Sequence, residues 1–368
     1  MRLRRVLPLG IWLPLAAVCI LSLPIRAEKV VPGKAVFDAI AGAEAIKPGS
    51  PVDYAELAFE PARWKERGIS TQMVPWEGQH IVFLTTAAPL DASAVTRFVK
   101  RMDSGWKLYA DLTGRSPSPH KQLRGKPVIA AVPDAELTCG YGCGFIGTTG
   151  IEIGGFYASD YPLIQRSPKA YPHYVFYEMG RNFYTFGDRH SLFITGYAVF
   201  MRYVCMDTLG CDDPDRGTRI AIEKAEALYA ESRDLTFLKA FTTLDGYDEK
   251  RPRLKALSPS DQPVIYASAM LKLHKECGKN DWLRRFYAAL AACPEVKPDS
   301  KEAGLRQSLH WYVAASIAAR KDLSSVFCDR WRLPLARKAR EAAAKIRWSR
   351  SDLKPAEALS AIPAEFTP

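Results

Sequence analysis

The residues with the clearest chemical potential lie in the segment HYVFYEMGRNFYTF, residues 173–186. On a helix, Tyr177 and Arg181 are four residues apart and share one face, with Glu178 beside them. The pattern H-E-x-x-H at this spacing brings two histidines and a general-base glutamate to a zinc ion. Here Tyr177 and Arg181 occupy the two histidine positions, and only the glutamate remains. The segment therefore has the spacing of a zinc site without its ligands.

Arg181 cannot replace a zinc ligand, because a guanidinium stays protonated and has no lone pair to donate. It instead places a permanent positive charge three residues from Glu178, a spacing at which two side chains meet on a helix. Loss of a metal would otherwise leave Glu178 as a buried, unpaired carboxylate, which is costly. We expect a Glu178–Arg181 ion pair in place of a metal, capped by a hydrogen bond from Tyr177. The alternative is an ordinary solvated helix face.

The residues before this helix predict a small mixed sheet with one long helix. Residues 81–85 are apolar and β-branched and favour a strand, and residues 125–133, GKPVIAAVP, favour a second one. Between them, apolar residues recur at helical spacing over residues 91–114. Asp91 is suited to cap the start of that helix and Gly114 to end it.

A glycine-rich stretch, CGYGCGFIGTTGIEIGGFY, follows, with seven glycines over residues 140–155. A phosphate-binding loop would need a helix directly after it, whereas the alternating Ile151 and Ile153 indicate a strand. We expect a turn pinned by a disulfide between Cys139 and Cys143 that leads into this strand. Glycines in a strand allow another backbone to approach closely.

The second half of the chain is predicted to be helical, because apolar residues recur there every three and four positions. The expected fold is α+β, with a mixed β/α lobe over residues 71–186, a helical lobe over residues 187–335, and a cleft between them. Residues 28–70 are expected to form a loosely structured leader. Residues 336–368 are expected to form a basic helix and a frayed tail.

Together these motifs resemble the zincin metallopeptidases, and within them the gluzincin and enhancin-like group. Strand, helix, strand and glycine-rich hairpin resemble the first lobe of that family, whose edge strand lies along the substrate. The segment ITGYAVFMRYVCMD is similar to the helix that supplies the third zinc ligand, and DLSSVFCDRWRLPL resembles the end of the helical lobe. The resemblance covers roughly residues 75–335. Y-E-M-G-R-N-F itself resembles a motif of uncharacterised secreted proteins.

Carried over to this sequence, the resemblance implies a zincin-like fold without its zinc. It places Thr195 at the third-ligand position, and threonine is a poor zinc ligand. The resemblance also implies that Gly150 and Glu152, beside the glycine-rich turn, lie along the ligand. Trp76, in the segment VPWEGQH, could line a peptide or glycan groove.

A displaced metal site is the main chemical alternative. His173 lies one turn before Tyr177, and Asp188 and His190 follow in FGDRHS. These three residues could hold a zinc ion with Glu178 nearby. A two-residue spacing in a loop is a weak signal, and single histidines more often satisfy local hydrogen bonds.

Residues 1–27 have the pattern of a secretory signal, with the basic start MRLRR, an apolar run and a polar exit. We therefore expect a secreted or periplasmic protein. The apolar run is about long enough to span a bilayer, so an uncleaved membrane anchor is the alternative.

The cysteines fit an exported protein, because disulfides persist in oxidising compartments. The pairs predicted from spacing are Cys139 with Cys143, Cys205 with Cys211, and Cys277 with Cys293. Cys328 is left over, and reduced buried thiols are the alternative. No cysteine pair has a histidine at zinc-finger spacing, so a structural zinc is not expected.

The chain is mildly basic. Its net charge is +11, and four of these charges come from the arginines of residues 1–27, which leaves seven. The charges are spread out and no nucleic-acid-binding module is recognisable, so nucleic acid is not an expected partner. We expect a secreted pseudopeptidase that binds a peptide or glycan in the cleft without a cofactor. The alternative is an active secreted hydrolase that uses Glu178 with a relocated zinc.

Overall fold

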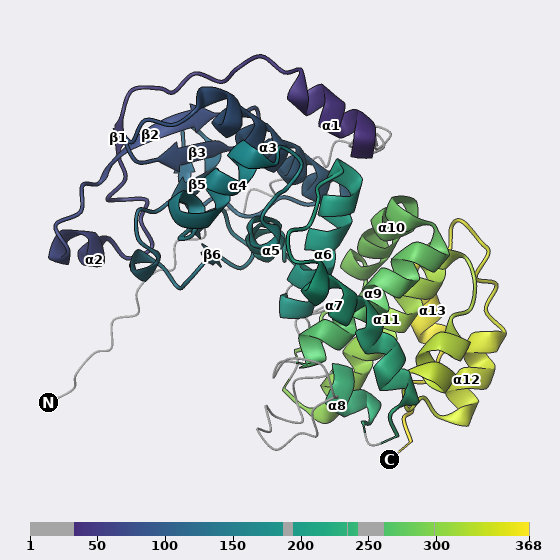
Figure 1. Cartoon of the computed structure of the whole chain (residues 1–368). Helices are drawn as coiled ribbons and strands as arrows, with labels where there is room; N and C mark the ends of the chain where they lie inside the picture. Colours follow the sequence, from purple (N-terminus) through teal and green to yellow (C-terminus); the bar gives the residue numbers. More distant parts are fainter. Residues whose placement is uncertain (1–32, 187–193, 234, 242–260, 298, 368) are drawn as a thin grey trace, which may run out of the picture.

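The protein combines one mixed sheet with many helices, so its class is α+β, as predicted (Figure 1). The computed structural model describes residues 33–186, 194–233, 235–241, 261–297 and 299–367. The first part of this range holds the sheet, and the part from residue 194 onward is helical. None of the described helices is both long enough and apolar enough to cross a bilayer.

The strands are β1 (Val52–Asp53), β2 (Gln72–Glu77), β3 (Val82–Thr85), β4 (Gln122–Leu123), β5 (Lys126–Ala131), β6 (Gly142–Gly144) and β7 (Ile151–Ile153). The helices are α1 (Gly33–Ala41), α2 (Pro61–Glu66), α3 (Ala92–Thr113), α4 (Tyr161–Arg166), α5 (His173–Asn182), α6 (Ile194–Leu209), α7 (Arg216–Glu231), α8 (Phe237–Phe241), α9 (Asp261–Cys277), α10 (Lys279–Ala291), α11 (Lys301–Ala319), α12 (Arg337–Ala344) and α13 (Pro355–Ala361). Short 3₁₀ and π-helical turns cover Ala135–Leu137, Phe156–Asp160 and Ser325–Arg330.

The sheet has the order β1-β2-β3-β5-β7-β6, with β4 paired to β5. β3, β5 and β7 are parallel, whereas β1, β2 and β6 pair antiparallel with their neighbours. Parallel β3 and β5 require a crossover, and α3 supplies it. β6 is the last strand on this path, so it forms an edge of the sheet beside the helix that carries Glu178.

α3 forms as its end signals predict. The Asp91 carboxylate accepts hydrogen bonds from the backbone N–H groups of Ser93 and Ala94, and the helix ends at Gly114, whose φ is +64°. Its apolar stripe packs with α5 and with one face of the sheet in the main core. The residues at its two ends therefore determine where this helix begins and ends.

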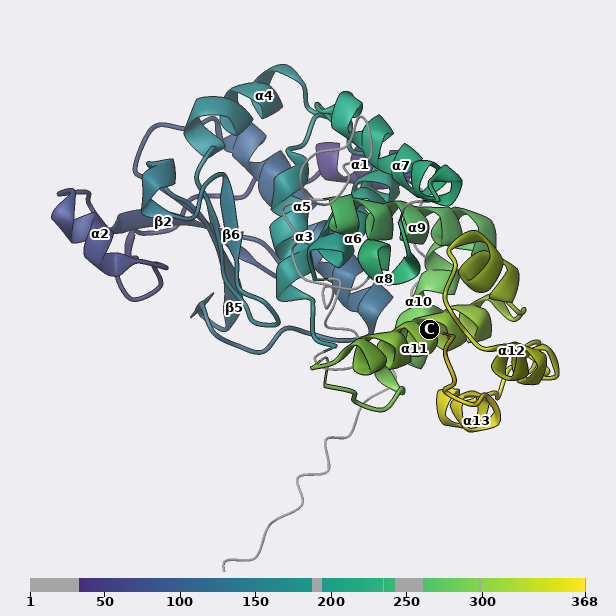
Figure 2. The same cartoon turned by 90° about the horizontal axis from the view of Figure 1, so that it is seen from below.

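The segment expected to be a loosely structured leader instead belongs to the fold. β1 pairs with β2, and Tyr54 and Trp64 are buried in a second core against the opposite face of the sheet. Figure 2 shows α2 on one side of the sheet and α3 and α5 on the other. The turn-rich composition of this segment favoured its interpretation as a leader. Its few large aromatic residues nevertheless cover a face of the sheet that would otherwise be exposed.

The helical part packs onto α5 through α6, which in turn packs on α9, while α10 contacts α11 and α3. The frayed tail predicted at the end of the chain is wrong. It contains α13, which packs on α11, and Leu335 and Phe366 form a β-bridge. Pro355 in the first turn of α13 has a backbone suited to a helix start, a signal that the tail interpretation overlooked.

The disulfide between Cys139 and Cys143 is present, whereas the other two predicted pairs are not bonded. Cys277 precedes α10 and Cys293 follows it. A helix rises about 1.5 Å per residue, so the two cysteines lie at opposite ends of an element roughly 20 Å long, beyond the reach of a disulfide.

The pairing of Cys205 with Cys211 fails for another reason. The prediction assumed a local loop, but α6 continues through Leu209, and the backbone N–H of Cys211 bonds to the carbonyl of Met206 at 2.9 Å. Both thiols are buried in the core, where burial raises the pKa of each.

Candidate functional site

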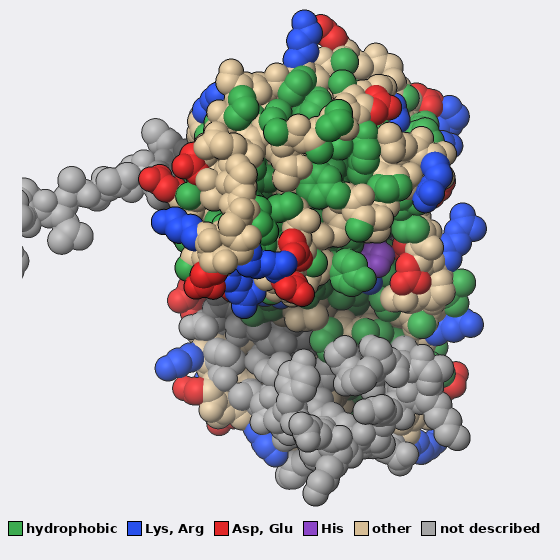
Figure 3. Space-filling model, turned by 60° about the vertical axis from the view of Figure 1, so that its left-hand side comes forward, with side chains coloured by type: hydrophobic (Ala, Val, Ile, Leu, Met, Phe, Trp, Pro, Cys, Tyr) green, Lys and Arg blue, Asp and Glu red, His purple; other side chains and the backbone are tan. Residues whose placement is uncertain are grey.

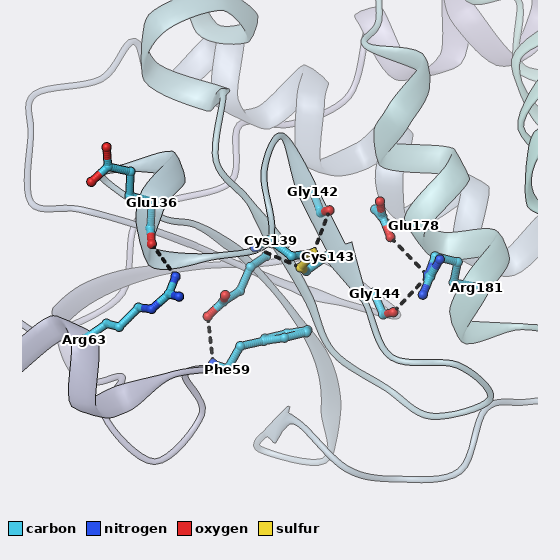
Figure 4. Close-up of a disulfide and its surroundings, with 10 residues drawn as sticks. Phe59, Arg63, Glu136, Cys139, Gly142, Cys143, Gly144, Glu178 and Arg181 are labelled. Atoms are coloured by element: carbon cyan, nitrogen blue, oxygen red, sulfur yellow. Dashed lines mark hydrogen bonds and ion pairs between the residues drawn. A yellow bond between two sulfur atoms is a disulfide. The ribbon is translucent and has the colours of Figure 1, made fainter. Parts of the chain in front are cut away.

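α5 presents two faces, as the sequence predicted. Val175, Met179 and Phe183 are fully buried in the main core, which fixes the rotation of the helix. Glu178 and Arg181 consequently point toward the edge strand β6, as Figure 4 shows. The helix ends earlier than expected, at Asn182, with Phe183 as its C-cap.

Glycines at alternate positions of β6 allow the helix to pack directly on this strand. A Cβ atom built on Gly142 would lie 2.9 Å from Cγ of Glu178. A Cβ on Gly144 would lie 2.6 Å from the backbone oxygen of Glu178 and 3.1 Å from its Oε2. Side chains do not fit at either position, so the close backbone approach expected from the glycine-rich stretch is confirmed, with α5 as the neighbour.

The register of the hairpin turns the backbone groups of Gly144 away from β7. The N–H of Gly154 donates to the carbonyl of Tyr141, and the N–H of Phe145 donates to the carbonyl of Gly150. Because antiparallel ladders alternate, Gly144 occupies a non-bonded position. Its N–H group donates to the Glu178 carboxylate, and its carbonyl accepts from Nε of Arg181 at 3.2 Å. The side chains of α5 thus satisfy an edge-strand residue on both its donor and its acceptor.

The predicted ion pair is present. Nε of Arg181 lies 3.6 Å from Oε2 of Glu178 (Figure 4). Glu178 is only 6% exposed, whereas the Arg181 side chain is 29% exposed. Burial raises the pKa of Glu178 to about 7, and the Arg181 charge and the Gly144 N–H lower it only in part. The arginine therefore compensates the buried carboxylate incompletely.

The predicted hydrogen bond from Tyr177 is wrong. Among the described residues, the Tyr177 hydroxyl bonds to neither member of the pair, and its partly buried ring packs against the main core. Thr195, the presumed third-ligand position, lies in the first turn of α6 with its side chain exposed. Within the described part of the chain, no hydrogen bond joins Thr195 to Glu178 or Arg181.

Sequence reasoning missed the role of Asn182. Its side-chain Nδ2 donates to the carbonyls of Phe145 at 2.8 Å and Gly150 at 3.1 Å, and the side chain is fully buried. The carbonyl of Arg181 accepts from the N–H of Gly147 at 3.0 Å. Consecutive residues of the segment YEMGRNF therefore hold the hairpin onto α5. Gly180 allows α6 to pack closely on the opposite side of α5, because a Cβ at this position would lie 3.0 Å from Cα of Ala198.

A second buried carboxylate contacts the same helix and was also missed. The Tyr174 hydroxyl donates a short hydrogen bond to Asp160, and Ser159 Oγ donates to its other oxygen at 3.3 Å. Burial raises the pKa of Asp160 to about 6. Tyr174 is four residues before Glu178, so one helix face carries both groups. That spacing was the available signal, since Asp160 itself lies in no recognisable motif.

The residues predicted to line a ligand groove do not do so. Trp76 is a buried residue of β2 whose indole N–H donates to Thr85 Oγ1 at 2.9 Å. Its flanking polar residues suggested a loop, but pairing with β3 makes the segment a strand. Gly150 is buried at the hairpin end with φ of +127°.

Glu152 faces the opposite side of the sheet from Glu178. It alternates with Ile151 and Ile153 along β7, and successive strand residues point to opposite faces. Its Oε1 accepts from the Tyr54 hydroxyl and from the Phe59 N–H, both at 2.9 Å. The carboxyl group is fully buried, and burial raises its pKa. It anchors the segment before α2.

The displaced metal site receives no support from His173. Its imidazole has its pKa lowered by burial and by the Arg202 charge, with Asp213 and Asp215 as its acidic neighbours rather than Glu178. Asp188 and His190 lie outside the described residues. Among the residues that are described, no three histidine, cysteine or acidic side chains come together as a metal site would require.

Three cavities formed by described residues do not have Glu178, Arg181 or Tyr177 in their walls. α5 packs against β6 on one side and α6 on the other, which leaves this part of the helix closely covered. The arrangement can neutralise charge and hold the hairpin. The resemblance places Tyr177, Arg181 and Thr195 at the ligand positions, and these side chains do not form a donor set for zinc.

No family model matches the sequence, and no curated protein does. A similar solved structure is that of a functionally unknown conserved protein from Bacillus anthracis str. Ames, with 12% identity and a TM-score of 0.49. The alignment covers 77% of this chain and 52% of the other, so the chain spans about half the length of that protein.

Proposed function

We propose that this protein is a secreted, zincin-like protein in which the Glu178–Arg181 pair stands in for the catalytic metal, and that it binds peptides without cleaving them. The observation that carries the proposal is the double engagement of the buried Glu178 carboxylate by Arg181 and by the N–H of Gly144. A general base must reach the proton that it removes. A carboxylate held on both sides at an edge strand is poorly placed to activate water.

The order of elements supports the zincin-like assignment. β3, α3, β5, the β6–β7 hairpin and α5 follow one another in the order expected from the resemblance. The antiparallel edge strand β6 lies against the helix that carries the glutamate. Because α5 already engages the backbone of Gly144, a peptide would lie beside the exposed residues at the two ends of β6 and would not pair along its edge.

Exposed apolar side chains at both ends of β6 favour a peptide over a glycan. Tyr141 is 73% exposed and Ile146 is 47% exposed, directly before and shortly after the strand. Figure 3 shows hydrophobic side chains gathered on one face of the molecule, with charged side chains around them. Exposed apolar patches rimmed by polar groups commonly mark interaction sites.

The test is binding of an unfolded, alkylated protein, such as carboxymethylated lysozyme, with Ile146→Asp as the variant. A charge at the end of β6 is expected to weaken binding on the order of tenfold, because it removes apolar contact area. Ile220→Asp is the matched control, since Ile220 is 51% exposed on α7, away from β6. Equal loss in both variants, or cleavage of the probe, would argue against the proposal.

A second candidate, a hydrolase that uses Glu178 as an acid or base, is favoured by one observation. The pKa values of Glu178 and Asp160 are raised to about 7 and about 6, and buried carboxyls with such shifts recur at catalytic sites. Hydrolysis of the same probe that stops on chelation, together with stoichiometric zinc in the purified protein, would favour this candidate over the first.

A further inference from the structure

A cavity of about 1190 Å³ lies in the helical part of the protein, and its walls include no residue of α5 or β6. It opens between α6, α7 and α9 and reaches the first turns of α10. Its size matches that of small-molecule sites, which commonly measure several hundred Å³ or more. The lining contains many charged side chains. The kind of ligand that fits therefore depends on which of these charges already have a partner within the protein.

Every acidic side chain in the wall already has a cationic partner. These ion pairs, at 2.5–2.9 Å, are Asp207 and Glu223 with Arg219, Glu226 with Arg330, Glu276 with Lys272, and Asp281 with Arg284. A cationic ligand would have to break one of these pairs to find a carboxylate. The wall is therefore unsuited to positive charge.

The groups left over in the wall are hydrogen-bond donors. Among the described residues, no carboxylate pairs with Lys275 or Lys279, and both side chains are exposed. Arg284 uses only Nη1 for Asp281, while its Nε and Nη2 are buried without a hydrogen-bond partner. Nε–H and Nη2–H point to the same side of a guanidinium and can hold two oxygens of one carboxylate or phosphate. A ligand would displace no partner from this fork.

Two further features bear on this preference. The Arg284 side chain is 19% exposed and lines the cavity, but Nε and Nη2 themselves are buried, so a ligand reaches the fork only when the guanidinium turns toward the cavity. The first turn of α10 lies in the same wall and has no side-chain cap, so its N–H groups add positive potential. Burial lowers the pKa of His274, and its Nε2 is 2.9 Å from Asn280 Oδ1.

We propose that this cavity binds a small organic anion through a carboxylate or phosphate group, held by the free fork of Arg284 with Lys275 and Lys279 beside it. The site is independent of Glu178 and of the proposed peptide surface. Neutral sugars carry no charge to pair with the ammonium groups of Lys275 and Lys279, so they are expected to bind far more weakly.

The test is calorimetric titration of the full-length protein with citrate, with inorganic phosphate and with glucose. Saturable binding of citrate or phosphate but not glucose is expected, and the better of the two identifies the group. Arg284→Gln and Lys279→Gln should each weaken that binding on the order of tenfold. Lys279 is exposed, so its variant is expected to fold even if the Arg284 variant does not.

Arg306→Gln is the matched control, because Arg306 forms an exposed ion pair with Glu302 on α11 and lies outside the cavity wall. It should bind the anion like the unmodified protein. Absence of saturable binding of both anions up to about 10 mM, or equal binding by the Lys279 variant and the unmodified protein, would overturn the proposal.

Discussion

Replacing Gly144 with alanine is expected to lower the free energy of unfolding by about 3 kcal/mol. The added Cβ would lie 2.6 Å from the backbone oxygen of Glu178, and neither the helix nor the edge strand can move without losing contacts. Moving them apart would also weaken the bonds of Gly144 to Glu178 and to Arg181. Urea denaturation followed by circular dichroism measures this loss.

Gly217→Ala is the control for this substitution. Gly217 lies in the first turns of α7, where a Cβ would meet only Oδ1 of Asp215 at 3.9 Å. Alanine has the higher helix propensity, so this variant should be unchanged or slightly more stable. If the Gly144 variant is tolerated as well as the Gly217 variant, α5 does not pack on β6 as described.

The free energy of unfolding is expected to depend on pH because the Glu178 carboxyl titrates differently in the folded and unfolded states. Its pKa is raised from an ordinary 4.5 to about 7, so the folded state holds this proton more tightly than the unfolded state does. The resulting stability is complete below pH 4.5 and is lost as the pH rises toward 7. The shift corresponds to about 3 kcal/mol. Asp160, raised from 3.8 to about 6, acts in the same direction at lower pH.

Glu178→Gln removes this titration. Its free energy of unfolding should fall less between pH 5 and pH 8 than that of the unmodified protein, by an amount on the order of 2 to 3 kcal/mol. At pH 8 the variant should be the more stable protein, because glutamine can still accept from Gly144 without burying a charge. Chemical denaturation at the two pH values measures the difference, with the exposed Glu302→Gln as the control. Parallel curves for all three proteins would contradict the buried position of the Glu178 carboxyl.

The elements that could be predicted from the sequence are those with local signals. Asp91 and Gly114 mark the ends of α3 because a cap and a left-handed residue act within one turn. The Glu178–Arg181 pair could be predicted for the same reason, since three residues on a helix bring the two side chains together.

The third partner of that pair could not be found in this way. Gly144 is more than 30 residues away in the chain, and only the sheet register brings it to α5. The glycines at positions 142 and 144 indicated that one face of a strand would carry no side chains, but they did not indicate which element would cover that face. Glu152 shows the converse, because its position between two buried isoleucines already indicated the opposite face.

Tertiary packing also decided the elements that were predicted wrongly. Trp76 lies among turn-like residues, yet pairing of β2 with β3 buries it. Cys277 and Cys293 are a different case, because the apolar spacing between them itself predicted the helix that holds them apart. At Trp76 the local sequence was compatible with two structures, and contacts from elsewhere selected one.

The proposed replacement of a metal by a fixed cation has a direct electrostatic consequence, because Arg181 should lower the pKa of the buried Glu178 carboxyl. Carbon-13 NMR titration of the Glu178 carboxyl, in the unmodified protein and in Arg181→Gln, with and without added zinc, measures this effect. The expected result is a pKa of about 7 that rises in the variant and does not respond to zinc in the unmodified protein. An unchanged pKa in the variant, or a fall of that pKa on addition of zinc, would show that the arginine does not occupy the place of a metal.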